Sequence, residues 1–350
     1  MIEIGGTSCR LIGTEEHYVP AQYVRANRPL VGTSWNDLDL EDLRFFLYDE
    51  RGRPWFDPLS DLAEGRMKAM DKAGIDVALL STLAPGVQLL QPDEGTALAS
   101  DMNDELAGYA RANPRIGGLA LFAPQDPAGA AKEIERAIRK LGLNGVIVYS
   151  HTAGEYLDDP KFWEIFEACE ALGAAVYIHP RNPPSAFRSL LENTAGEKIL
   201  ASGIWGFQLE TSLHAVRLLV SGVFDRFPKL QVVLGHMGEG LPYWLYRLDY
   251  MYERGYRKQG RGAAKRLPSE YFLDNFHVTI SGLHDHPMCA PTLEFCHAVL
   301  GPERIMFASD FPFQSSEQAS NVLQTSKLPA EHLRAIAHRN AERLFHVAPL

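Results

Sequence analysis

Four short segments of the chain each end an apolar, strand-like run with side chains that bind metal ions. These side chains are Glu15 and His17, His179, His236, and Asp310. A set that mixes imidazole and carboxylate groups suits Zn2+, Mn2+ or Fe2+, and the carboxylates favour Mn2+, with Zn2+ second. A divalent ion held by such groups acts as a Lewis acid or activates water. The residue types therefore predict metal-assisted chemistry.

Eight candidate strands position these residues. The apolar runs lie at 11–14, 77–81, 117–122, 145–149, 175–179, 231–235, 277–281 and 305–309. Their β-branched and apolar residues are consecutive rather than alternating, which is typical of parallel strands that are covered on both faces.

Helix-like stretches separate the strands. They lie at 62–72, 97–112, 128–141, 160–172, 208–224, 241–254 and 291–299, with a last one at 330–344. This alternation predicts an α/β fold, a (β/α)8 TIM barrel, as a single domain over residues 1–350. An open doubly wound sheet is the alternative, but residues 15–18 offer no glycine-rich phosphate loop after the first strand.

Residues that follow the strands of a barrel converge on one mouth, so distant ligands can meet one ion there. Glu15 and His17 are two residues apart on an extended segment and point to the same face, whereas Glu16 points away. Many two-metal barrels hold a bridging lysine at the end of strand four, but residues 146–150 read Val-Ile-Val-Tyr-Ser. We therefore expect one divalent metal ion.

Two connections are unusually long, at residues 20–58 after strand one and 181–206 after strand five. Long βα-loop insertions on a barrel usually form the substrate pocket or a lid. Surface decoration or an oligomer contact is the alternative.

The composition narrows the class of partner. The 350 residues are 46% hydrophobic and carry a formal net charge of -10 without a long block of Lys or Arg, so neither nucleic acid nor an anionic membrane is an expected partner. No apolar run is long enough to span a bilayer, and the first residues lack a signal-like pattern. Four cysteines without a CxxC spacing suggest no disulfide framework. We expect a cytoplasmic enzyme for a small molecule.

The strand-end motifs carry a resemblance that covers nearly the whole chain. Glu-x-His at 15–17, Ile-His-Pro at 178–180, Gly-His-Met-Gly-Glu at 235–239 and Ser-Asp-Phe-Pro-Phe at 309–313 resemble the amidohydrolase superfamily. The similar branch comprises non-oxidative decarboxylases of aromatic acids, including γ-resorcylate, 2,3-dihydroxybenzoate and 5-carboxyvanillate. Residues 241–251 look closest to the 5-carboxyvanillate enzymes, whereas His17 matches the resorcylate type.

The resemblance implies roles for these residues. It implies that Glu15, His179 and Asp310 bind the metal ion with His17, and that Asp310 delivers a proton with His236 and Glu239 as its relay or as partners of the phenolate. It also implies that Arg247 and Arg66 bind the substrate carboxylate. A homodimer or homotetramer is expected on the same ground.

The predicted reaction is therefore decarboxylation of an ortho-hydroxylated aromatic acid, by protonation of the ring carbon that bears the carboxylate and release of CO2. One alternative keeps the barrel but hydrolyses an amide, a lactone or a ring-cleavage product with a metal-bound hydroxide. A barrel that has lost catalysis and keeps only a structural ion is the other alternative.

Overall fold

The computed structural model describes residues 1–33, 37–188, 200–260, 262–284 and 286–348. Eight parallel strands form one sheet in the order in which they occur in the chain. They are β3 (Ile12–Tyr18), β4 (Val77–Thr82), β5 (Ile116–Leu121), β6 (Gly145–Tyr149), β7 (Val176–His179), β8 (Val232–Leu234), β9 (Phe276–Thr279) and β10 (Ile305–Met306). Each predicted strand is present, with ends that differ by up to four residues.

The sheet curls so that its two outer strands, β3 and β10, approach each other. The Thr14 amide donates to the Phe307 carbonyl at 3.1 Å, and the His17 amide donates to the Phe311 carbonyl at 2.8 Å. These bonds bring the sheet close to a closed barrel, so the prediction of a (β/α)8 barrel is confirmed.

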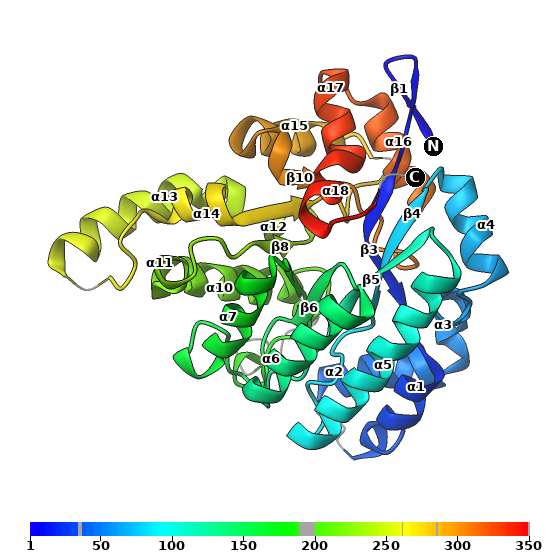
Figure 1. The fold of residues 1–350 in the computed structure, drawn as a ribbon. Coiled ribbons are helices and arrows are strands. Elements are labelled where there is room, and N and C mark those ends of the chain that lie inside the picture. Colours follow the sequence, from blue (N-terminus) through cyan, green and yellow to red (C-terminus); the bar gives the residue numbers. More distant parts are fainter. Residues whose placement is uncertain (34–36, 189–199, 261, 285, 349–350) are drawn as a thin grey trace.

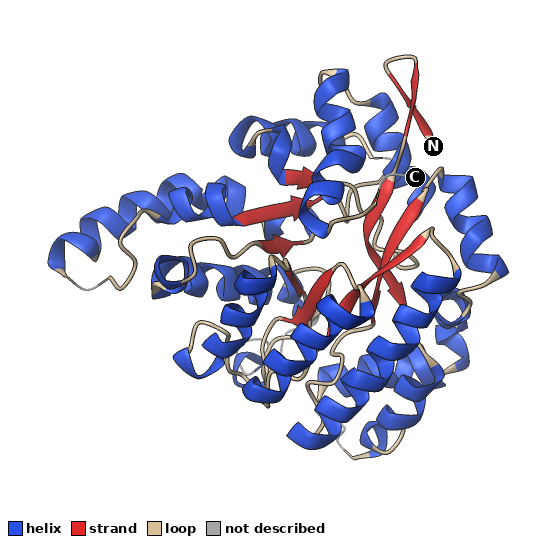
Figure 2. Cartoon of the chain, viewed as in Figure 1, coloured by secondary structure: helices blue, strands red, loops and turns tan. Residues whose placement is uncertain are grey.

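Full burial explains the unbroken apolar strands. Every residue of β4, β5, β6 and β7 is buried. Residues on one face pack inside the barrel, and those on the other face pack against the surrounding helices. Figure 2 shows this arrangement, with the strands in the centre and helices outside them.

Helices follow the strands, and most of them cover the outside of the barrel. They are α4 (Glu64–Ala73), α5 (Pro92–Ala112), α6 (Pro127–Arg136), α7 (Trp163–Leu172), α10 (Gly206–Ser221), α11 (Val223–Arg226), α13 (Leu241–Gly255), α14 (Pro268–Asn275), α15 (Cys289–Leu300), α16 (Ser316–Thr325), α17 (Ala330–Arg334) and α18 (Asn340–Phe345). Short π-helical segments at Ala137–Leu141 and Ala335–Arg339 continue α6 and α17. Within the described residues, no helix is long and apolar enough to cross a membrane.

The first long connection folds into helices. It contains α1 (Ala21–Asn27), α2 (Leu38–Tyr48) and α3 (Arg53–Ser60). The Asp37 side chain caps α2 by accepting a hydrogen bond from the Leu40 amide. In the second connection, α8 (Ser185–Arg188) follows β7, and residues 189–199 lie outside the described part.

Helices α14 and α16 were not among the predicted helices, and two larger features were not predicted either. Residues before the barrel form an antiparallel hairpin of β1 (Ile2–Ile4) and β2 (Thr7–Cys9). In addition, α13 and α14 run outward from the barrel as an arm, which is drawn in yellow in Figure 1.

Candidate active site

The structure brings the four predicted metal ligands together. Glu15 and His17 lie on β3, His179 ends β7, and Asp310 follows β10. Each offers one ligand atom, and these four atoms lie within 4.8 Å of one another. All four residues are buried. Strand ends from opposite sides of the barrel therefore converge on one point, as expected for its mouth.

Two atoms of this cluster fit a metal ion in particular. Glu15 Oε1 and His179 Nε2 are buried and have no hydrogen-bond partner. They lie 3.3 Å apart. A buried carboxylate oxygen without a donor is costly, and a divalent cation would satisfy both atoms. The donor set therefore fits one divalent metal ion.

Hydrogen bonds behind the ligands fix their orientation. The Tyr177 hydroxyl and Thr279 Oγ1 both donate to Glu15 Oε2, which leaves Oε1 facing the cluster. His179 Nδ1 lies 2.7 Å from the Pro180 carbonyl, and His17 Nδ1 lies 3.2 Å from the Thr82 carbonyl. A carbonyl accepts only, so each Nδ1 carries a proton when it bonds there. Each Nε2 then faces a carboxylate of the cluster, His179 toward Glu15 and His17 toward Asp310 at 3.2 Å, where it can bind a metal ion.

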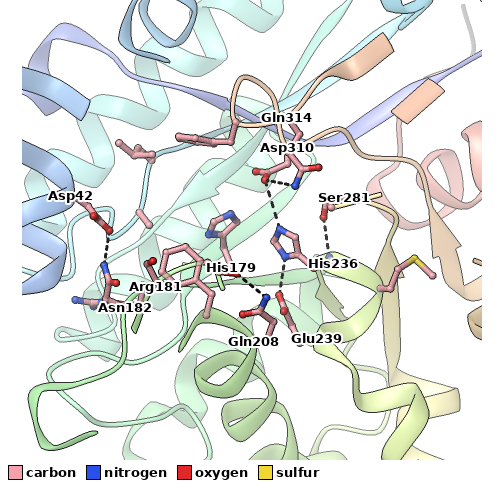
Figure 3. Close-up of a pocket in the computed structure, with 18 of the residues that line it drawn as sticks. Asp42, His179, Arg181, Asn182, Gln208, His236, Glu239, Ser281, Asp310 and Gln314 are labelled. Carbon is pink, nitrogen blue, oxygen red and sulfur yellow. Dashed lines mark hydrogen bonds and ion pairs between the residues drawn. The ribbon is translucent and has the colours of Figure 1, made fainter. Parts of the chain in front are cut away.

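His236 lies beside the cluster on a tight turn, α12 (His236–Glu239). Its Nδ1 is 2.8 Å from Glu239 Oε1, and its Nε2 is 3.7 Å from Asp310 Oδ2. Figure 3 shows the imidazole between these two carboxylates. The residues of the turn have left-handed backbone angles, with φ of 48° at His236 and 54° at Glu239. Such angles are costly for non-glycine residues and are typical of functional sites.

The charges of the cluster favour a cation. Burial alone would raise the pKa of the Glu15 carboxyl, but the imidazoles of His236, His179 and His17 hold that pKa well below its usual range. Conversely, burial lowers the pKa of His236, but the Glu239, Glu15 and Asp310 carboxylates outweigh it and raise the pKa well above its usual value. The carboxylates therefore attract positive charge to this point, from protons or from a metal ion.

The cluster opens into a cavity of about 770 Å³. Phe45, Phe46 and Phe313 supply aromatic walls, and Asp42 and Gln314 supply polar groups. A cavity of this size and mixed character suits a small aromatic molecule. Residues from both long connections line it, which is the pocket-forming role expected of them.

Several polar residues that line this cavity were not predicted from the sequence. Asn182 donates to Asp42 Oδ2 at 2.7 Å and to Asp39 Oδ1 at 3.2 Å, and Arg181 forms a buried ion pair with Asp39. They lie in the two long connections, which contain no motif that marks them. The only available signal was the placement of both connections after strand ends.

The two predicted substrate-binding arginines do not line this cavity. Arg66 is 2% exposed, and its guanidinium donates to the His17 carbonyl from behind the site. Arg247 lies on the arm and lines a separate apolar cavity of about 620 Å³ with Trp244 and Met251. The geometry of one chain therefore does not support a contact between either arginine and the substrate.

Comparisons with known proteins agree with the fold and the cluster. The amidohydrolase family matches residues 17–347. The γ-resorcylate decarboxylase of a Polaromonas species is 33% identical over 82% of this chain and 88% of its own. The crystal structure of 5-carboxyvanillate decarboxylase from Sphingomonas paucimobilis superposes with a TM-score of 0.91, at 43% identity, and covers 97% of this chain and 100% of that one.

A third relative contains a metal ion. The 5-carboxyvanillate decarboxylase of Novosphingobium aromaticivorans has a TM-score of 0.90 and 36% identity, with 99% of this chain and 100% of that chain covered. Its crystal structure holds manganese and 3-methoxy-4-hydroxy-5-nitrobenzoic acid.

The chain belongs to the amidohydrolase family. Within that family it is a metal-dependent aromatic acid decarboxylase, a carboxy-lyase, which confirms the prediction at this level.

Proposed function

We propose that the protein removes CO2, without an oxidant, from an aromatic acid that carries a hydroxyl ortho to the reacting carboxylate. The observation that carries this proposal is the four-ligand cluster at the wall of a 770 Å³ aromatic-lined cavity, next to the His236–Glu239 pair. 5-Carboxyvanillate and dihydroxybenzoates such as γ-resorcylate are the first candidates, since the named relatives act on them.

We assign the metal site to Glu15, His17, His179 and Asp310 and favour Mn2+, with Zn2+ second. Carboxylates on two of the four ligands support Mn2+, and so does the manganese in the Novosphingobium enzyme. When bound, the metal would supply Lewis-acid binding of the substrate carboxylate and phenolate.

The protein side chains orient the ring and provide the proton. The phenylalanines of the cavity provide apolar contacts for the substrate ring, in a cavity whose wall also contains His236 and Asp310. A proton passes from this pair to the ring carbon that bears the carboxylate. The carbon–carbon bond then breaks, its electron pair restores the aromatic ring, and CO2 leaves.

Glu239 and His236 form the proton relay in this proposal. Glu239 holds His236 Nδ1, which directs Nε2 toward Asp310. Asp310 is both a proposed metal ligand and a proposed proton donor, and a carboxylate bound to a dication is a poor acid on its own. A relay through His236 removes this conflict. The imidazole can supply the proton while Asp310 remains a ligand.

The first test is a panel of ortho-hydroxybenzoates that includes 5-carboxyvanillate and γ-resorcylate. Protein is stripped of metal, reloaded with Mn2+ or Zn2+, and assayed for CO2 release and change in ultraviolet absorbance. We expect CO2 from at least one compound with the Mn2+ form, and no CO2 from the stripped protein or from Asp310→Asn. Turnover of an amide or lactone with uptake of solvent oxygen, and no CO2 from the panel, would indicate hydrolysis instead.

We also propose that the enzyme is a cytoplasmic homo-oligomer that binds neither nucleic acid nor membranes. The four cysteines are free and buried, which suits a reducing compartment. The arm helix α13 exposes Tyr243, Trp244 and Tyr246 at 69%, 50% and 80%. Contiguous exposed aromatic residues of this kind are typical of protein interfaces.

A further inference from the structure

We infer that Glu16 is a positioning residue that holds the Asp310 segment in its ligand geometry through its two hydrogen bonds to Ser309. This inference rests on the metal site proposed above. It assigns a task to a carboxylate that lies on the opposite face of β3 from Glu15 and His17.

Glu16 forms hydrogen bonds with the residue that precedes Asp310. Its side chain is 1% exposed. Oε1 accepts a hydrogen bond from the Ser309 amide at 3.0 Å, and Oε2 accepts one from Ser309 Oγ at 2.6 Å. Ser316 Oγ lies 2.8 Å from the same serine hydroxyl. Both carboxylate oxygens of Glu16 are therefore committed to one residue.

The Asp310 segment contacts β3 through an isolated bridge and two backbone hydrogen bonds, and the bonds from Glu16 add to this short connection. β10 ends at Met306, so Ser309 and Asp310 lie beyond the regular strand. Asp310 has a φ of 58°, in the left-handed region that non-glycine residues avoid. Its amide donates to the Glu15 carbonyl at 2.9 Å. Side-chain bonds from Glu16 thus complete the connection between β3 and the ligand segment.

Arg66 offsets part of the buried charge. Its guanidinium is 2% exposed, donates to the His17 carbonyl, and lies 4.4 Å from the centre of the Phe311 ring. Burial raises the pKa of Glu16 from 4.5 to about 7 and outweighs Arg66 and His17, which act to lower that pKa. Arg66 therefore reduces the cost of burying this carboxyl group without removing that cost.

Gly13 leaves room for the Glu16 carboxylate. A Cβ atom built on Gly13 would collide with Glu16 Oε1. Gly13 has no left-handed backbone angle. Gly13→Ala should therefore displace the carboxylate without changing its chemistry. This substitution offers a second way to disturb the contact.

The test measures Mn2+ binding, independently of turnover. Mn2+ is titrated into stripped wild-type protein, Glu16→Gln, Ser309→Ala and Gly13→Ala, and free Mn2+ is read by electron paramagnetic resonance. The spectrum of the bound ion and the melting temperature of the stripped protein are recorded in parallel. Glu133→Gln is the matched control, since Glu133 is a buried carboxylate on α6 that accepts bonds from Asn103 and Arg136.

We expect the dissociation constant for Mn2+ to rise about tenfold in Glu16→Gln and Ser309→Ala, as is usual when a group that orients a ligand is lost. The bound-ion spectrum should change, while stripped variants melt no lower than Glu133→Gln. If Ser309→Ala binds Mn2+ with the wild-type affinity and spectrum, the inference is wrong. If Glu16→Gln does not fold, Ser309→Ala alone tests the inference. If the wild-type protein binds no Mn2+, both the proposed metal site and this inference are wrong.

Discussion

His236 is the residue that we expect to act in catalysis without binding the metal ion. It lies outside the four-ligand cluster but reaches both Glu239 and Asp310. His236→Asn should lower kcat by about 100-fold or more, the usual contribution of a general acid, and leave the dissociation constant for Mn2+ within a few-fold of wild type. Steady-state kinetics and Mn2+ titration check the two expectations.

A matched histidine serves as the control. His297 lies on α15 and faces His332 at 3.0 Å, away from the cavity. His297→Asn should retain wild-type kcat. If His236→Asn instead lost Mn2+ and kept its kcat when saturated with the ion, His236 would be a ligand rather than a part of the proton path.

Individual site residues could be predicted where the strand order alone determines their position. The clustering of Glu15, His17, His179 and Asp310 was predicted because parallel strands deliver their ends to one mouth. Arg66 and Arg247 depended on resemblance, and spacing along a helix does not reveal which cavity a long side chain enters. The sequence predicted that Glu16 points away from the cluster but not its contact with Ser309, because that contact depends on how the chain turns after β10.

At the scale of elements, the contact between α10 and the end of β6 makes stability depend on pH. Glu210 of α10 accepts hydrogen bonds from Tyr156 at 3.1 Å and from Ser150 at 3.2 Å. Burial raises the pKa of Glu210 from 4.5 to about 7, although both hydroxyls act to lower it. The folded state therefore prefers the protonated acid.

The sign of the effect follows from that preference. Protonated Glu210 makes its full contribution to the stability of the folded state below pH 4.5. This contribution is lost as the pH rises toward 7, because the carboxyl group then loses its proton. Glu210→Gln stays neutral, so its stability relative to wild type should rise across this interval, by an amount on the order of 3 kcal/mol. Urea unfolding of both proteins at several pH values measures the difference. A constant difference would show that Glu210 keeps its ordinary pKa.

Periodicity predicted the elements of the barrel better than those of the insertions. Strand β6 matched residue for residue, because consecutive buried Val and Ile residues have few other structures available. The predicted strand at 305–309 is only Ile305–Met306 in the structure, since the chain then turns to contact β3. Helix α2 has no simple apolar stripe, because Leu40, Leu43 and Leu47 pack into the core while Asp42, Phe45 and Phe46 face the cavity.

At the scale of the whole molecule, we expect the arm to be the surface through which copies of the chain associate. Figure 1 shows α13 extending from the barrel, and Tyr246 at 80% exposure is its most exposed aromatic residue. A large exposed aromatic surface on a helix that stands away from the body suits a symmetric contact with a second copy. Arg247 is adjacent in sequence to Tyr246, so assembly would also change its surroundings.

We therefore expect the wild-type protein to sediment at two or four times its chain mass of 39.0 kDa. Tyr246→Asp places a charge in the apolar contact and should shift the protein toward 39.0 kDa. Tyr109→Asp is the control, because Tyr109 is 39% exposed on α5, on another part of the barrel. Analytical ultracentrifugation at several concentrations distinguishes the forms. A wild-type protein that stays monomeric throughout would leave the arm without this role.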